Sequence, residues 1–267
     1  MLARGALAIL KEPPLRRFVK PILRALPVAI SLKALWDAAD RPPYLFGVLH
    51  AAERAKREGH PAVSVIEFGV AEGYGLLALQ KHAAAVERYT GVKIHVYGFD
   101  RGSGLPQGTG DYRDHPDVWK PGDYQMNEPW LRRQLGARST LTIGDVGATA
   151  MTQAFAAPIG FAALDLDFYS STSAALQILL REDVQLLHRV ALYFDDIDAA
   201  YNHRFAGALL AIEEFNLDSK RVKIDQWRGV QSGRPFPDAD WLRSMYLAHN
   251  LAAISQVTLT RSAARMR

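Results

Sequence analysis

Aspartates close two apolar segments of the sequence, and their positions could build a metal site. Asp167 follows one apolar segment, and the adjacent pair Asp195 and Asp196 follows another. If the two segments are neighbouring parallel strands about 4.8 Å apart, the three carboxylates meet at one edge of a sheet. Carboxylates crowded in this way repel one another unless they are protonated or neutralised. A divalent cation with oxygen ligands, such as Mg²⁺, is therefore expected here, whereas helix capping explains one aspartate only.

A glycine-rich turn follows an earlier apolar segment. Gly69, Gly73 and Gly75 have the spacing G-x-x-x-G-x-G, and Glu67 stands two residues before the first of them. Glycine lets the backbone approach a ligand closely and tolerates positive φ. Because a dinucleotide-binding turn has the order G-x-G-x-x-G, this spacing disfavours an NAD-dependent dehydrogenase. The acids near the turn suit a positively charged cofactor better than a pyrophosphate.

Two further acids stand where strands are expected to end. Asp100 could accept hydrogen bonds from both ribose hydroxyls of a nucleoside, or it could cap an ordinary turn. Asp145, in a Gly-Asp pair, could bond the amino group of an adenine ring, although such pairs also form plain turns. Together with Glu67 and Asp165, these residues make the strand ends acidic.

The elements that must position these residues follow from the hydrophobic periodicity. Expected strands occupy 63–68, 94–99, 139–143, 159–165 and 190–195, and expected helices occupy 75–88, 127–135, 171–181 and 204–216. This alternation predicts a parallel α/β sheet with helices on both faces. Ligands of such sheets bind outside the carboxyl ends of the strands, which is where the acids and glycines described above are found.

The chain divides into an N-terminal helical extension or cap, residues 1–60, and a main α/β domain, residues 61–267. Pro21 and Pro27 interrupt the periodicity of the extension. This favours packing on the main domain or on another subunit over insertion into a membrane surface. Residues 101–126 form a long segment rich in glycine, proline and aromatic residues. Because long segments of this kind are commonly functional, one interpretation is a substrate loop or lid. The other interpretation is an ordinary surface loop.

Composition excludes several classes of site and partner. The 267 residues include no cysteine, which excludes disulfides and cysteine zinc sites. The net charge of +4 is uneven: residues 1–24 carry six basic residues and one glutamate, residues 241–267 carry four arginines and no acid, and the rest is net −5. Nucleic-acid binding by the main domain is therefore disfavoured.

Because no apolar run approaches the ~18 residues of a membrane span, we expect a cytoplasmic protein, with at most a weak peripheral membrane contact by the N-terminal helix.

Four motifs in order resemble the macrocin O-methyltransferase family, which are class I methyltransferases that use S-adenosylmethionine. The motifs are Glu67 to Gly75, Gly98-Phe99-Asp100 with Gly104-Leu105-Pro106, Asp165 to Thr172, and Phe194-Asp195-Asp196. The resemblance covers roughly residues 62–217 and departs at Leu187-His188-Arg189, where the family has a Pro-Gly-Gly type of turn. It implies a Rossmann-like, doubly wound, mostly parallel seven-stranded sheet. It also implies S-adenosylmethionine and Mg²⁺ as cofactors, and O-methylation of a small sugar-like or vicinal-diol acceptor.

Roles for individual residues follow from the motifs and the resemblance together. Predicted cofactor contacts are Glu67, Gly69, Gly73, Gly75, Asp100, Asp145 and Asp165. Predicted metal ligands are Asp167, Asp195 and Asp196. Asp167 is also the first candidate to take the proton of the acceptor hydroxyl. His203 is the second, although a lone histidine in a loop is commonly just solvated.

Two other functions stay open on the same scaffold. The acid cluster could hold iron in a metal-dependent hydroxylase of an antibiotic-type pathway. Alternatively, the chain could be a non-catalytic, methyltransferase-like binding protein that assembles with partners through its N-terminal helices. The presence of the acids predicted to bind the cofactor and of those predicted to bind the metal counts against this alternative. The same helices favour a homo-oligomer.

Overall fold

The computed structural model describes residues 14–108 and 110–258. The predicted extension 1–60 and the predicted main domain 61–267 therefore each include residues outside the described ones, namely 1–13 and 259–267. Residue 109, within the predicted lid, also lies outside them. In the described ranges, no helix has the length and apolar character needed to cross a membrane.

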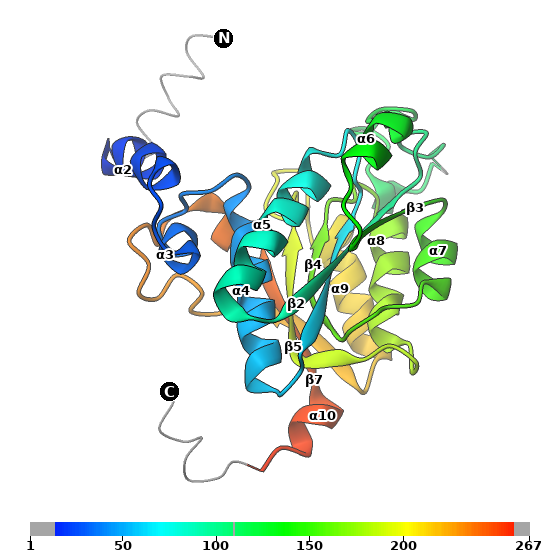
Figure 1. Ribbon diagram of the computed structural model, residues 1–267. Coiled ribbons are helices and arrows are strands. Elements are labelled where there is room, and N and C mark those ends of the chain that lie inside the picture. The colour runs from blue at the N-terminus through cyan, green and yellow to red at the C-terminus, as the bar shows by residue number, and fades with distance from the viewer. Residues whose placement is uncertain (1–13, 109, 259–267) are drawn as a thin grey trace.

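A seven-stranded sheet organises the described part of the chain (Figure 1). Its strands are β1 (Ala62–Phe68), β2 (Lys93–Asp100), β3 (Ser139–Ile143), β4 (Ile159–Leu164), β5 (Leu186–Phe194), β6 (Val222–Gln226) and β7 (Met245–Asn250). Their order is β3-β2-β1-β4-β5-β7-β6. The first five strands pair in parallel, and β7 runs antiparallel to both of its neighbours. The predicted Rossmann-like, doubly wound, mostly parallel sheet is confirmed.

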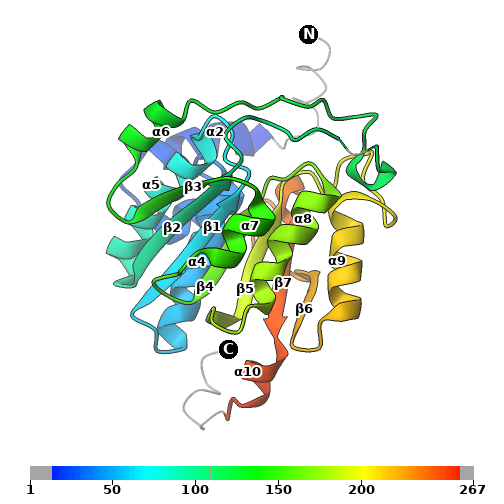
Figure 2. The same ribbon diagram turned by 90° about the vertical axis from the view of Figure 1, so that its right-hand side faces the viewer.

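Helices cover both faces of this sheet. The helices of the described residues are α2 (Pro14–Ala25), α3 (Ile30–Leu35), α4 (Pro42–Arg57), α5 (Tyr74–Thr90), α6 (Glu128–Gln134), α7 (Val146–Thr152), α8 (Tyr169–Leu176), α9 (Gly207–Asp218) and α10 (Leu251–Ser255). Short 3-10 turns are η1 (Tyr112–Asp114), η2 (Gln177–Leu180) and η3 (Asp240–Leu242). Helices α4 and α5 pack on one face, and α7, α8 and α9 cover the other, as Figure 2 shows.

Alternation along β1 divides the core into two layers. Val63 and Val65 pack with the residues of α4 and α5, while Ile66 and Phe68 pack with those of α8 and α9. The division arises because successive side chains of a strand point to opposite faces. Glu67 has the same parity as Val63 and Val65, so its carboxyl group lies on the α4 side of the sheet, where it bonds a tyrosine of that helix.

Helix α4 belongs to the layer that covers the sheet, although it lies within the predicted extension 1–60. Its residues Tyr44 and Val48 are fully buried in the core. Helix α2, in contrast, exposes Phe18 and Ile22 and stands away from the sheet in Figure 1. The division of the chain at residue 60 stays a prediction.

Segment 101–126 crosses the edge at which β1 to β5 end (Figure 2). Backbone hydrogen bonds of 2.8 and 2.9 Å, from Leu105 N to Asp123 O and from Gly122 N to Leu105 O, join its two arms. The buried carboxylate of Asp114 accepts hydrogen bonds from Ser170 N and Ser170 Oγ, at 2.8 and 3.0 Å, and so ties the segment to the start of α8. The segment is therefore fastened over the carboxyl edge of the sheet.

Candidate active site

A cavity of about 530 Å³ opens at the carboxyl edge of the sheet. Its walls come from the ends of β1 to β5, from the glycine turn and from segment 101–126. The predicted site residues in these walls are Glu67, Gly69, Asp100, Asp145, Asp165, Asp167, Asp195 and Asp196. Gly73, Gly75 and His203 lie outside the walls.

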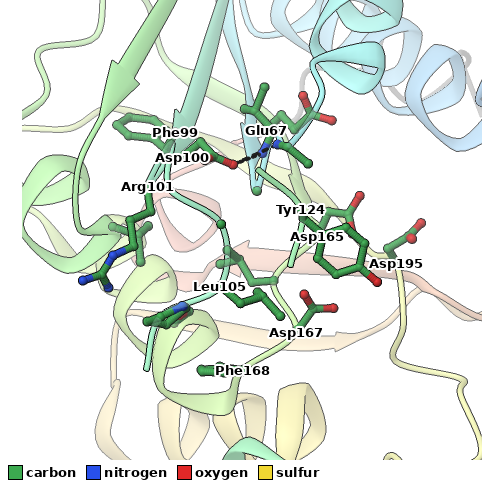
Figure 3. Close-up of a pocket in the computed structure, with 18 of the residues that line it drawn as sticks. Glu67, Phe99, Asp100, Arg101, Leu105, Tyr124, Asp165, Asp167, Phe168 and Asp195 are labelled. Atoms are coloured by element: carbon green, nitrogen blue, oxygen red, sulfur yellow. Dashed lines mark hydrogen bonds between the residues drawn. The ribbon is translucent and has the colours of Figure 1, made fainter. Parts of the chain in front are cut away.

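Aspartates gather at the ends of β4 and β5 (Figure 3). One carboxylate oxygen from each of Asp165, Asp195 and Asp196 lies within 4.8 Å of the other two. Asp167 lies beside this group, close enough for the charges of Asp196 and Asp165 to act on its carboxyl group. The three-residue group thus differs from the predicted ligand set, which contained Asp167 in place of Asp165. Carboxylate oxygens at this spacing suit a hard divalent cation.

Burial raises the pKa of two carboxyl groups in this region, those of Asp165 and Asp167. Burial first, and the charge of Asp195 second, raise the pKa of Asp165 to about 7. Burial, followed by the charge of Asp196, raises the pKa of Asp167 to about 8. Arg41, whose Nη1 lies 3.7 Å from Asp165 Oδ2, opposes the rise at Asp165. A cluster of acids in this state gains free energy when a bound cation neutralises it.

Tyrosines lie beside two of the carboxylates. Tyr193 OH donates a hydrogen bond to Asp195 Oδ1 at 2.6 Å. Tyr201 lies near Asp196, and burial first and the charge of Asp196 second raise the pKa of its hydroxyl group. A hydroxyl group supplies a donor without a full positive charge, so these contacts position the carboxylates but leave their negative charges to be balanced by other means.

Asp100 fastens the glycine turn to the end of β2. Its Oδ2 accepts hydrogen bonds from Val70 N and Ala71 N, both at 2.8 Å, and its Oδ1 accepts one from Gly102 N at 2.5 Å. Figure 3 shows the carboxylate turned toward the backbone of the turn. The predicted contact with ribose hydroxyls would use the lone pairs that these three bonds leave over, since a carboxylate has about four acceptor positions.

Two glycines of the turn are required by contacts inside the protein. Gly69 has φ of +80°, and a Cβ at this residue would lie 1.9 Å from the carbonyl oxygen of Asp165. A Cβ at Gly75 would lie 1.8 Å from Glu67 Oε1. The glycine spacing therefore lets the turn pack against β4 and against the Glu67 carboxyl group.

Glu67 is a buried acid with one unpartnered oxygen. Its Oε1 accepts a hydrogen bond from Tyr44 OH at 2.7 Å. Its Oε2 is buried and has no hydrogen-bond partner among the described residues. Burial raises the pKa of Glu67 to about 8, although the hydrogen bond from Tyr44 opposes this rise. A buried unpartnered oxygen in a cavity wall is suited to accept a hydrogen bond from a ligand.

The end of the cavity at β2 and β3 combines apolar and charged residues. Phe99, Arg101, Asp145 and Val146 line it, where β2 and β3 end. Asp145 is exposed and caps α7, with Oδ1 accepting a hydrogen bond from Ala148 N at 3.3 Å. Figure 3 shows Arg101 at this end, away from Asp195. An apolar ring with a polar edge could lie at this end of the cavity, beside Val146.

Comparisons with known proteins identify the fold of the chain. No protein-family model and no curated protein matches the sequence. Among solved structures, CalS11, a calicheamicin methyltransferase, is similar with a TM-score of 0.52 and 20% identity, covering 89% of this chain and 93% of that chain. Cofactor-bound Rv0187 from MTB is similar with a TM-score of 0.50 and 15% identity, covering 89% and 96%. The chain has a methyltransferase fold.

Within this methyltransferase fold, several residues of the cavity region were missed from the sequence. Arg41 and Tyr44 come from the region before β1, far from the motifs, and carry no local signal. Tyr193 precedes Asp195 by two residues, so strand parity could have placed both on one side of β5. Tyr201 follows the Asp195-Asp196 pair in a loop, whose conformation periodicity does not predict.

His203, the second predicted proton acceptor, is not brought together with the aspartates. Its side chain is exposed, and its Nδ1 accepts a hydrogen bond from Phe205 N at 3.2 Å. Its ring packs against that of His115, with 5.7 Å between the centroids. Tyr201, in the same loop, is the residue that contacts the acid cluster.

Proposed function

We propose that this chain is an S-adenosylmethionine-dependent O-methyltransferase that uses Mg²⁺ or a similar divalent cation. Its acceptor would be a hydroxyl group of a small sugar-like or vicinal-diol molecule. The observation that carries the proposal is the shared cavity, because acids from the ends of β4 and β5 line the same space as the glycine turn. The fold shared with the calicheamicin methyltransferase CalS11 supports a methyl transfer reaction.

The residues present fit both the donor and the cation. The unpartnered Oε2 of Glu67 can accept a hydrogen bond from the amino group of the donor. The acidic wall also suits the positive charge of a sulfonium. For the cation, Asp165, Asp195 and Asp196 offer three oxygen ligands in one small volume.

When bound, S-adenosylmethionine supplies an activated methyl group, and Mg²⁺ supplies a positive charge that orients and acidifies neighbouring hydroxyl groups. Asp167 lies beside the proposed ligands and can take the acceptor's proton on a carboxylate oxygen. Its pKa of about 8 in the cation-free protein is near the operating range of a general base. Asp167 would thus leave the acceptor oxygen deprotonated and ready for the methyl group that S-adenosylmethionine would supply.

Aromatic residues of segment 101–126 support the assignment of the acceptor. Trp119 and Tyr124 line the cavity from this segment, with 6.4 Å between their ring centroids. Aromatic faces stack on sugars and on other rings. We therefore assign segment 101–126 as the substrate lid.

Calorimetry and a transfer assay test the proposal. Binding of S-adenosylmethionine, measured with and without Mg²⁺, tests the donor, and transfer of a labelled methyl group to a panel of catechols and sugars tests the reaction. Binding without transfer to any acceptor would support the non-catalytic alternative. Hydroxylation that is restored by iron and not by magnesium would support the hydroxylase.

We further propose that the chain forms homo-oligomers in the cytoplasm through its N-terminal helices. The exposed Phe18 and Ile22 of α2 support a partner there, whether a second copy or a weakly bound membrane surface. Light scattering after size-exclusion chromatography measures the oligomeric state, and sedimentation with vesicles measures membrane contact.

A further inference from the structure

Arg41 is an unexpected cation in an acidic cavity. Among the described residues that line the cavity, the cations are Arg41 and Arg101, set against eight acids. Arg101 lies at the β2 end, whereas Arg41 lies beside Glu67 and Asp165, where β1 and β4 end. The two arginines therefore serve different parts of any ligand that spans the cavity.

The backbone holds Arg41 in an uncommon conformation. Its φ of 44° and ψ of 71° are left-handed, and it stands directly before Pro42 and Pro43 at the start of α4. A residue with a side chain in this region costs about 1 kcal/mol or more, so its persistence at a cavity wall suggests a role in binding. Most residues other than glycine would be strained in this conformation. We therefore look to the contacts of the Arg41 side chain for the free energy that offsets this strain.

The protein satisfies few of the donors of this guanidinium. Arg41 Nη1 donates to Tyr44 OH at 3.3 Å and lies 3.7 Å from Asp165 Oδ2. The guanidinium lies over the Tyr44 ring, 5.1 Å from its centroid. A guanidinium has five N–H donors in a planar fork, which matches the two oxygens of a ligand carboxylate.

An arginine and a buried acid thus stand side by side, bridged by one tyrosine. Tyr44 OH accepts from Arg41 Nη1 and donates to Glu67 Oε1, while Glu67 Oε2 has no hydrogen-bond partner among the described residues. This arrangement is complementary to an α-amino acid group, in which a carboxylate and an ammonium share one carbon. Arg41 would face the carboxylate and Glu67 the ammonium.

The distance across the sheet agrees with this arrangement. The ring-binding end lies over β2 and β3, and the Arg41 end lies over β1 and β4, two adjoining pairs in the strand order. Strands are about 4.8 Å apart, so the two ends are about 10 Å apart. A nucleoside joined to an amino acid by a short chain covers such a distance.

We propose that Arg41 binds the carboxylate of the methionine portion of S-adenosylmethionine, and that Arg41, Tyr44 and Glu67 together form its amino acid subsite. This inference rests on the proposed function, and it assigns to the region before β1 a direct part in holding the methyl donor. Among the described residues, Arg41 Nη1 donates a hydrogen bond to Tyr44 OH, so other N–H groups of the guanidinium remain for a carboxylate.

Decarboxylated S-adenosylmethionine provides the test, because it keeps the nucleoside, sulfonium and amine and lacks only the carboxylate. Calorimetry would compare both ligands on the wild-type protein and on Arg41→Met. The wild type is expected to bind S-adenosylmethionine roughly 10- to 100-fold more tightly than the decarboxylated form, as for a hydrogen-bonded charge pair. In Arg41→Met this preference should vanish, and Arg41→Lys should restore part of it.

Arg101→Met is the matched control, since it removes the other cavity cation at the β2 end. It should change the affinities of both ligands by the same factor and so preserve the preference. A preference that survives in Arg41→Met would overturn the role of Arg41 while leaving the methyltransferase assignment intact. A wild-type protein that binds neither ligand in the presence of Mg²⁺ would overturn the proposed function itself. Thermal denaturation of each variant shows whether the variant is folded.

Discussion

The molecule buries aspartates in two regions and neutralises them differently. Asp37, between α3 and α4, is 1% exposed and accepts a hydrogen bond from Arg234 Nη2 at 2.7 Å. Arg234 is itself 4% exposed, and its guanidinium lies over the rings of Phe46 and Trp241, at 5.1 and 4.9 Å. This pair joins the region before β1 to the connection between β6 and β7.

Among the described residues, no arginine or lysine pairs as closely with the aspartates of the cavity. Asp165, Asp195 and Asp196 crowd within 4.8 Å, and the nearest arginine lies 3.7 Å from Asp165 alone. Asp37 is neutralised within the chain and so serves the fold. The cavity acids repel one another in the folded state, which is tolerable where a bound cation completes the site. Substitutions in the cavity should therefore lower activity, whereas substitutions of the Asp37–Arg234 pair should lower the stability of the fold.

The largest effect is expected from Asp195→Asn. Loss of one proposed ligand should lower methyl transfer by about 10³-fold or more, since a catalytic cation contributes several kcal/mol. Calorimetry should show S-adenosylmethionine binding close to wild type. Asp198→Asn is the matched control, because Asp198 belongs to the same segment but pairs at the surface with Arg243 Nε at 2.6 Å. Full turnover in Asp195→Asn would contradict the metal role.

The second effect concerns the structural pair. Arg234→Met should lower the free energy of unfolding by about 3–5 kcal/mol, because it leaves Asp37 buried without its cation. Urea denaturation measures the loss. Adding Asp37→Asn removes the orphaned charge and should recover part of the stability. The folded variant should keep its turnover number. A loss of turnover as large as that of Asp195→Asn would contradict the purely structural role of the Asp37–Arg234 pair.

The third effect separates the proton acceptor from the ligands. Asp167→Asn should lower kcat by about 10²-fold, the lower end of general-base contributions. Stabilisation of this variant by Mg²⁺, measured as a rise in Tm, should persist, because Asp165, Asp195 and Asp196 form the closer group. His203→Ala should leave kcat near wild type. The reverse outcome, with His203 essential and Asp167 dispensable, would exchange the two roles.

The smallest effect is a pH dependence of the stabilisation by Mg²⁺. Asp165 and Asp167 have pKa values of about 7 and 8 in the folded protein, above their ordinary values near 4. The folded state therefore binds more protons than the unfolded chain between pH 4 and 8, and their contribution to stability falls as pH rises. Mg²⁺ competes with these protons, so the increase in Tm that it causes should grow from pH 5 to pH 8. A constant increase would indicate that the ion binds elsewhere.

Parts of this site were predictable because they depend on periodicity. The ends of β1, β2, β4 and β5 were predicted to within a few residues, so Glu67, Asp100 and the Asp195-Asp196 pair could be placed at one edge of the sheet. The glycine spacing also indicated a tight turn, which the positive φ of Gly69 and Gly73 bears out. Each of these inferences needs only local residues and the parallel order of strands.

By itself, the sequence determined the alternation of strands and helices and the acidic edge, since both follow from the order of apolar and charged residues along the chain. Only the tertiary structure decided that Asp165 joins Asp195 and Asp196 while Asp167 stands beside them. It likewise decided that Asp100 accepts hydrogen bonds from the glycine turn and that Tyr44 joins Arg41 to Glu67. The physical reason is that these choices depend on side-chain direction past the strand ends and on contacts between distant segments, which hydrophobic periodicity does not encode.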